Sequence, residues 1–219
     1  MTLHRTPSAR RCGTLAAALV AIVFLAVSAR ALAANLLPGS GFDAPDDLTM
    51  HWGNLGPGKV WSSEDRLGSD SSGSLLMING EDPGTGILLF SSCVPVVAGN
   101  AYDFGGWSYI PFLQPADGFA QVRIQWRETC PAGAFTGSEV AATSTTIGEW
   151  TLVEGEAEAP VGAGGARLAL SNGKTSGAEG IGFEVYFDDV FLPEPGGAGS
   201  ATGAFLALAA LRRRARPRE

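Results

Sequence analysis

Basic residues are scarce in the middle of this 219-residue chain. Between Asn35 and Pro193, six Lys and Arg residues stand against twenty Asp and Glu residues, which gives that span a net charge of −14. Because phosphate binding needs a basic patch, this composition excludes nucleic acid and anionic membrane surfaces as expected partners. The acidity is typical of a solvated extracellular surface or of a protein that binds cations.

Histidine is almost absent, and His51 is the only one in that span. Nucleophile triads need a histidine beside a nucleophile motif, and "DDLTMHWGN" contains none, so His51 is expected to be a structural or surface residue. The segment "SNGKTSG" is not a phosphate loop, because Leu168 stands where that motif requires a glycine; it is expected to be a turn. The sequence therefore predicts a protein that is not an enzyme. A glycan hydrolase that uses two of the carboxylates is the open alternative.

Cysteine is also rare, with three in the whole chain. Cys12 lies near the N-terminus, which leaves Cys93 and Cys130. An even number in an exported chain predicts a disulfide between them. The alternative is a metal site built on two thiolates, but His51 is the only histidine available to complete it.

No apolar run reaches the roughly 20 residues that a membrane-spanning helix requires. At the N-terminus, basic residues precede the short run "LAAALVAIVFLAVSA", and small residues follow at Ala31 and Ala33. This order is typical of a secretory signal peptide over residues 1–33, with an uncleaved membrane helix as the alternative. The sequence thus predicts an exported protein.

The C-terminus carries a second segment of this kind. "LPEP" precedes an uncharged stretch rich in Gly and Ala, and five arginines follow between Arg212 and Arg218. The stretch has no polar face, which a packed surface helix would show, and the arginines would stay on the cytoplasmic side of a membrane. Residues 194–219 resemble the PEP-CTERM sorting signals of bacteria. The resemblance implies a hydrophobic helix that holds the protein in the membrane transiently, until a sorting protease of the exosortase type removes it.

The span between these segments shows short apolar runs bounded by Gly, Pro, Asn and Asp, at intervals of about ten residues. In "QVRIQWR" the alternation places Val122, Ile124 and Trp126 on one face of a strand. Eight or nine such strands predict one all-β domain, a two-sheet sandwich over residues 35–193. The expected strands are "SLLMIN", "GILLFSSCVPV", "AYDFGGWSYI", "AQVRIQWRE", "EVAATSTTI", "EWTLVEGEAEA", "ARLALSN" and "GFEVYFDDVFL".

Three blocks of this span resemble the carbohydrate-binding modules attached to cellulases and xylanases. They are "NLLPGSGFD" followed by Trp52, "GEWTLVEGEAEAPVGAGGARLALSNG", and "FEVYFDDVFL". The resemblance implies a jelly-roll sandwich of the galactose-binding type that binds polysaccharide. Because the module stands alone between two sorting signals, it is expected at the cell surface or in the extracellular matrix. The alternative is a structural or protein-interaction domain with the same fold and no sugar site.

Asp188 and Asp189 interrupt the apolar run "YFDDVFL". A buried carboxylate needs a partner, and carboxylates are preferred ligands of Ca²⁺. Modules of the resembled family often hold a structural calcium ion, and by motif its ligands here would be Asp43 and Asp188. The alternative is that Asp189 is exposed and Asp188 only accepts hydrogen bonds from the backbone of a neighbouring loop.

A sugar platform needs a flat aromatic side chain flanked by planar polar groups. Trp107 and Tyr109 share one face of their strand, and "QVRIQWR" supplies Arg123 and Gln125. If the two strands share a sheet, these four residues line its concave side. A bulge at Gly105–Gly106 would instead turn Trp107 into the core, where large aromatic residues usually lie. The tryptophans expected in the core are Trp126 and Trp150.

Overall fold

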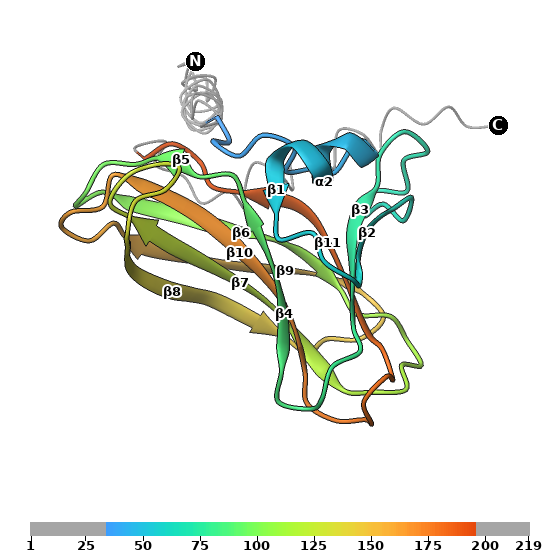
Figure 1. The fold of residues 1–219 in the computed structure, drawn as a ribbon. Helices are drawn as coiled ribbons and strands as arrows, with labels where there is room; N and C mark the ends of the chain where they lie inside the picture. The colour runs from blue at the N-terminus through green and yellow to red at the C-terminus, as the bar shows by residue number, and fades with distance from the viewer. Residues whose placement is uncertain (1–33, 196–219) are drawn as a thin grey trace, which may run out of the picture. The chain divides into compact units, whose positions relative to one another are not determined.

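The structure is a computed structural model that describes residues 34–195 (Figure 1). This region forms two antiparallel sheets and one short helix, which confirms the predicted β-sandwich. No helix among residues 34–195 is long and apolar enough to cross a membrane. The predicted signal peptide and most of the predicted sorting segment lie outside the described residues.

The sheets are named after their inner strands, β7 and β6. The β7 sheet has the strand order β1-β4-β10-β7-β8, with β5 also paired to β10, and the β6 sheet has the order β2-β3-β11-β6-β9. The elements are α2 (Pro45–His51), β1 (Trp52–Gly53), β2 (Lys59–Ser62), β3 (Ser74–Asn79), β4 (Gly86–Ser91), β5 (Val94–Pro95), β6 (Ala101–Tyr109), β7 (Gly118–Arg127), β8 (Phe135–Ser144), β9 (Trp150–Glu158), β10 (Gly165–Lys174) and β11 (Phe183–Phe191).

Every predicted run contains a strand, and "GILLFSSCVPV" is divided between β4 and β5. The sequence analysis missed β1, β2 and α2. The two strands are only two and four residues long, and the helix only seven, so none is long enough to show a clear period. Helix α2 lies next to β1 (Figure 1).

The core fills the space between the inner faces of the two sheets. Val122, Ile124 and Trp126 of β7 are at most 2% exposed, as the alternation predicted. Tyr102 and Trp126 bring the two sheets together, with ring centroids 5.9 Å apart. Since apolar burial is the main favourable term in folding, this alternation is sufficient to fix which face of each strand turns inward.

A buried asparagine connects the two sheets. Asn172 of β10 donates hydrogen bonds from Nδ2 to the carbonyl oxygens of Met77 (2.8 Å) and Phe183 (2.7 Å), which belong to β3 and β11 of the opposite sheet. Asn79 Nδ2 donates in turn to the carbonyl oxygen of Asn172, at 3.0 Å. These bonds link β10 to two strands of the opposite sheet and give the buried amide nitrogen of Asn172 its partners.

The segment "SNGKTSG" is not the predicted turn, because its first residues continue β10. Lys174 is 1% exposed, and its ammonium group donates to the carbonyl oxygens of Glu81 (2.8 Å), Ala178 (2.7 Å) and Ile181 (2.7 Å). A buried ammonium has three donors, and all three are used. Lys174 therefore fastens two loops to the end of β10.

Candidate functional site

The candidate site lies on the outer face of the β7 sheet, where polar side chains from neighbouring strands come into register. Gln125 of β7 pairs with Arg167 of β10, and Arg123 pairs with Ala169. On the other side of β10, Ala169 pairs with Phe90 of β4. Because alternate residues of a strand share a face, these side chains project from the same surface as Gln121 and Arg127.

Phe90 and Arg167 form the centre of this face. The guanidinium carbon of Arg167 lies 3.9 Å from the centroid of the Phe90 ring, and Arg167 Nε donates to Gln125 Oε1 at 2.9 Å. The pairing partners of Phe90 on its two sides are Gly53 and Ala169, whose small size leaves room over the sheet. The stack and the amide bond together hold the guanidinium plane in one orientation.

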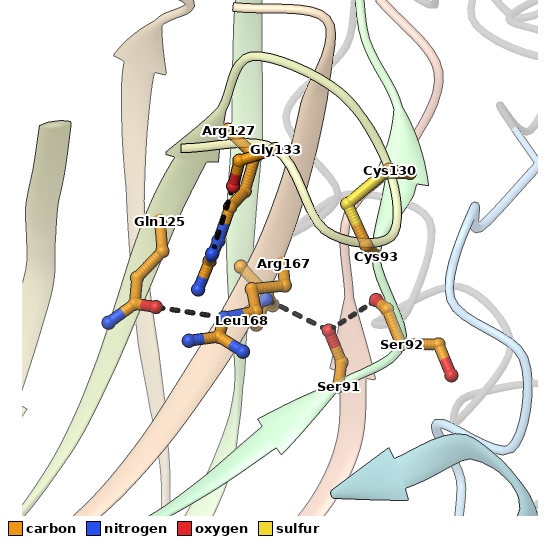
Figure 2. The surroundings of a disulfide bond; sticks show 9 residues. All are labelled: Ser91, Ser92, Cys93, Gln125, Arg127, Cys130, Gly133, Arg167 and Leu168. Carbon is orange, nitrogen blue, oxygen red and sulfur yellow. Dashed lines mark hydrogen bonds between the residues drawn. A yellow bond between two sulfur atoms is a disulfide. The ribbon is translucent and has the colours of Figure 1, made fainter. Parts of the chain in front are cut away.

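Arg127 brings a second guanidinium group to the same region (Figure 2). Its Nη1 donates to the carbonyl oxygen of Gly133 at 3.1 Å, while its Nε is buried and has no partner among the described residues. Figure 2 shows that the side chains of Arg127, Gln125 and Arg167 point into the same space. Burial lowers the pKa of Arg167, and the positive charge of Arg127 lowers it further.

The disulfide holds the end of this site together. Cys93 and Cys130 are bonded, with 5.5 Å between their Cα atoms, which confirms the predicted pairing. The bond crosses β10 at Gly165, where a Cβ atom would lie 2.6 Å from Cys130 Sγ and 2.9 Å from Cys93 Sγ, so that any side chain would collide with it. The loop that carries Gly133, the partner of Arg127, is thereby fixed to the connection between β4 and β5 (Figure 2).

A surface cavity of about 530 Å³ adjoins Phe90 on the side of β1. Asn54 is exposed there, has φ of 68°, and donates from Nδ2 to the carbonyl oxygen of Leu88 at 2.8 Å. The cavity is lined by Met50, His51, Trp52, Gly53, Asn54, Phe90, Ser91, Ser92 and Arg167. Helix α2 and strand β1, which were not expected from the sequence, supply one side of the cavity.

Arg123 continues the polar face in the other direction along β7. Its Nε donates to Gln121 Oε1 at 2.6 Å, and Gln121 Nε2 donates to Thr143 Oγ1 at 2.9 Å. The face therefore presents planar amide and guanidinium groups that are already held by hydrogen bonds. Such preorganised donors suit ligands rich in hydroxyl or carboxylate oxygens.

The four residues predicted to line one platform do not lie together. Arg123 and Gln125 belong to β7, whereas Trp107 and Tyr109 belong to β6 in the other sheet. The prediction required the two strands to share a sheet, and the chain instead crosses between the sheets through residues 110–117. Trp107 and Tyr109 therefore face outward on the opposite side of the sandwich.

Trp107 is not turned inward by a bulge in β6. The pairing of β6 with β9 runs without a register shift, and the irregularity lies in β11 between Asp188 and Phe191. Arg66 covers the outer side of Trp107, with its guanidinium carbon 4.5 Å from the ring centroid. Trp107 is thus partly buried beneath another side chain rather than packed in the core.

Trp150 was predicted in the core, and this prediction is wrong. Trp150 is only partly buried, and its ring stacks on Tyr109 with the centroids 5.5 Å apart. Tyr186 of β11 extends the group at 5.9 Å from Tyr109. Burial raises the pKa of Tyr186, with smaller contributions from the charges of Glu184 and Glu64. The outer face of the β6 sheet is therefore aromatic, whereas that of the β7 sheet carries arginine and glutamine.

The predicted calcium ligands both contact the loop between β2 and β3. Asp188 is 2% exposed and accepts hydrogen bonds from the backbone N–H groups of Arg66 (3.2 Å) and Asp189 (2.7 Å), while Asp43 accepts one from Ser72 Oγ at 2.8 Å. Burial and the charge of Asp189 raise the pKa of Asp188 to about 7. The side chain of Arg66 pairs with Asp189, so Asp188 receives only backbone donors among the described residues.

Asp43 and Asp188 supply only part of the ligands that a calcium ion requires. Within residues 34–195, no three His, Cys, Asp or Glu side chains gather closely enough to hold a metal ion. Ca²⁺ takes six to eight oxygen ligands, so Asp43 and Asp188 would need backbone carbonyls and water to complete the shell. The buried carboxylate of Asp188, which has no cationic partner in this region, is the feature that a bound cation would match.

No protein-family model matches the chain, and no curated protein is similar to it in sequence. Solved structures resemble it in fold. The tandem CBM22-1–CBM22-2 domain from the N-terminus of Paenibacillus barcinonensis Xyn10C is 16% identical, with a TM-score of 0.51, over 75% of this chain and 50% of that one. The enzymatically active domain of tailspike protein 4 from bacteriophage CBA120 is 11% identical, with a TM-score of 0.50, over 73% of this chain and 21% of that one.

A third structure, Family 16 Carbohydrate Binding Module-2, is 14% identical with a TM-score of 0.49, over 74% of this chain and 100% of that one. The present chain spans about half of the tandem domain and about a fifth of the tailspike chain. The likeness to the tandem domain concerns the fold alone, the two-sheet β-sandwich that residues 34–195 share with it.

Proposed function

We propose that the described domain is a non-catalytic module that binds polysaccharide on the outer face of the β7 sheet. One observation carries the proposal: Phe90, Arg167, Gln125 and Arg127 form a group of planar side chains, held by hydrogen bonds and a ring contact, beside a cavity of about 530 Å³. Specific sites are typically concave and combine apolar surface with a few convergent polar groups.

Each part of this group has a role in the proposed binding. Gln125 and the guanidinium groups donate to sugar oxygens, and their fixed orientation reduces the entropy that is lost when a ligand binds. Phe90 supports the guanidinium group of Arg167, and Gly53 beside Phe90 leaves room for a sugar ring over the sheet. The fold shared with carbohydrate-binding modules supports this assignment, although fold alone does not decide function.

We place the module outside the cell, at the surface or in the matrix. The N-terminal pattern of residues 1–33 and the C-terminal pattern of residues 194–219 support export followed by transient retention in the membrane. A membrane sorting protease that recognises the C-terminal segment is the implied partner. The disulfide supports the same proposal, because such bonds persist in oxidising compartments.

We also propose that a structural Ca²⁺ binds at Asp43 and Asp188. Both carboxylates contact the loop between β2 and β3, so an ion there would fasten this loop to β11 and to the residues before α2. The ion would act on stability rather than on the ligand, since Asp188 belongs to the β6 sheet and the proposed sugar site lies on the β7 sheet.

A glycan array tests the proposed function. The full chain is applied to immobilised plant, bacterial and algal polysaccharides, with heat-denatured chain as the control for non-specific adsorption. We expect saturable binding to at least one polysaccharide, and we expect Gln125→Ala to weaken it by tenfold or more. Binding no stronger than that of the denatured chain across the array would contradict the proposal. So would binding that Gln125→Ala leaves unchanged.

A further inference from the structure

We infer that the site on the β7 sheet is selective for acidic polysaccharide and holds a uronate carboxylate between Arg127 and Arg167. This inference rests on the proposed function and specifies the class of ligand. The two side chains reach the same space from neighbouring strands: Arg167 pairs directly with Gln125, and Arg127 lies two residues further along β7 on the same face (Figure 2).

Positive charge is concentrated on the outer face of the β7 sheet. Of the six basic residues between positions 35 and 193, three (Arg123, Arg127 and Arg167) lie on the outer face of the β7 sheet. The remaining ones have other partners: Arg66 pairs with Asp189, Lys174 binds loop carbonyls, and Lys59 Nζ donates to the carbonyl oxygen of Asn54. In a span with a net charge of −14, half of the cations are gathered on one surface.

These arginines have no acidic partner among residues 34–195. The ion pair found there joins Arg66 to Asp189 at the β6 sheet, whereas Arg127 and Arg167 donate to Gly133 and Gln125, which are uncharged. Burial lowers the pKa of Arg167 and the positive charge of Arg127 lowers it further, so the two like charges lie close enough to repel each other. An anion placed between them would relieve this repulsion.

Both guanidinium groups keep free donors. Arg127 Nε is buried with no hydrogen-bond partner in residues 34–195. Arg167 donates to Gln125 through Nε, and its two terminal nitrogens have no hydrogen-bond partner within the same residues. A buried donor without a partner is costly unless a ligand satisfies it. The planar fork of a guanidinium group matches the two oxygens of a carboxylate.

Phe90 is not an open stacking platform. A neutral sugar ring usually stacks on an open aromatic face, but the Phe90 ring is covered by the guanidinium group of Arg167 at 3.9 Å. The exposed aromatic side chain of this sheet, Phe135, lies on the edge strand β8, and the stacked pair of Tyr109 and Trp150 lies on the other sheet. The centre of the site therefore presents a guanidinium group rather than a bare ring. A sugar that carries a carboxylate can pair with this group, whereas a neutral sugar cannot.

The test compares acidic glycans with their uncharged counterparts. Binding of the full chain to hexamers of galacturonate, mannuronate and guluronate, and to glucuronoxylan, is measured by calorimetry at low salt. Each probe is paired with its carboxyl-reduced form, which has the same linkages without the charge. We expect at least one acid to bind tenfold or more tightly than its reduced partner, and added salt to diminish the difference.

Substitutions test whether Arg127 and Arg167 cause the preference for the acidic glycan over its carboxyl-reduced form. Arg127→Gln and Arg167→Gln are each expected to lower affinity for the acid about tenfold or more while leaving affinity for the reduced form within about twofold. Ser63→Asp is the matched control: it changes the net charge by the same amount at an exposed position that follows β2 of the other sheet, and it should have little effect. Thermal melting of each variant separates loss of the site from loss of the fold.

The outcomes distinguish this inference from the proposed function. If every reduced form binds as tightly as its acid, or if only neutral glycans bind, the inference is wrong and the proposed function stands. If Ser63→Asp weakens binding as much as Arg167→Gln, net charge and not the site explains the preference, and the inference also fails. If no glycan of any kind binds, the proposed function itself is contradicted.

Discussion

The guanidinium carbon of Arg167 lies 3.9 Å from the centroid of the Phe90 ring, although the two residues come from strands far apart in the sequence. Phe90 pairs with Ala169 in the β4–β10 register, so Arg167 is its diagonal neighbour on the same face. A slip of one residue would move either side chain to the opposite face of the sheet. The site is therefore a consequence of strand pairing and is absent from any single stretch of the sequence.

The disulfide should contribute substantially to stability. Cys93 and Cys130 are 37 residues apart, and a loop of this length corresponds to about 4 kcal/mol in the chain-entropy model. We expect the double substitution Cys93→Ala and Cys130→Ala to lower the melting temperature clearly, with weaker glycan binding because the Gly133 loop is released. Intact-mass analysis with and without reductant measures the bond directly. Two free thiols in exported protein would contradict the assignment.

Lys174→Met should be strongly destabilising. The methionine fills a similar volume but leaves three loop carbonyls without their charged donor, at a cost of roughly 3 kcal/mol or more. Thr175→Met, at the exposed neighbouring position, is the control and should change the free energy of unfolding by about 0.5 kcal/mol or less. Urea denaturation measures both. Equal stability of the two variants would show that the Lys174 bonds contribute little.

Asp188 should make the stability of the calcium-free protein depend on pH. Its pKa is raised from 3.8 to about 7 in the folded state, so its contribution is fully present below pH 4 and is lost as the pH rises through 7. In chelator, the wild-type protein should therefore lose up to about 4 kcal/mol between pH 4 and pH 8 from this group. Asp188→Asn should remove that part of the dependence.

Calcium should reverse this loss. An ion that binds only the folded state raises the melting temperature, so at pH 8 the wild-type protein should melt higher in calcium than in chelator. Asp188→Asn and Asp43→Asn should each reduce the difference. Identical melting curves for the wild-type protein in the two conditions would mean that Asp188 is held by its backbone hydrogen bonds alone.

The C-terminal segment should be absent from mature protein. The "LPEP" motif, the apolar stretch and the five arginines predict processing during export; the apolar stretch and the arginines lie beyond the described region. Mass spectrometry of protein from a host with the sorting machinery should find a C-terminus before Arg212. Soluble exported protein that still ends in "RRRARPRE" would overturn this prediction. Replacing the arginines with serine should disturb retention.

The fold was predictable because each of the longer strands carries its own signal, whereas the short strands β1 and β2 do not. The alternation in "QVRIQWR" placed Trp126 in the core, and the even cysteine count gave the disulfide. The site was predictable only in part. Arg123 and Gln125 were named as ligand-binding candidates and lie on the proposed face, whereas Phe90 and Arg167 were missed because their strands look like ordinary core strands.

The assignment of Trp107 and Tyr109 to the same platform failed for a related reason. A period of two shows that a strand has two faces, but it does not show which sheet the strand joins. Trp150 illustrates the same limit: its size suggested the core, and its stack on Tyr109 holds it on the outer face instead. Sheet membership depends on long-range pairing, which the local pattern does not encode.

Two matched substitutions test whether the sugar site lies on the β7 face or on the β6 face. Phe90→Ala and Tyr109→Ala each remove one aromatic ring, from the β7 face and the β6 face respectively. Calorimetry with the tightest glycan from the array should show a loss of tenfold or more for Phe90→Ala, because Arg167 loses its support, and a change within about twofold for Tyr109→Ala. If Tyr109→Ala abolishes binding while a folded Phe90→Ala variant binds like the wild-type protein, the sugar site is on the other sheet and the account is contradicted.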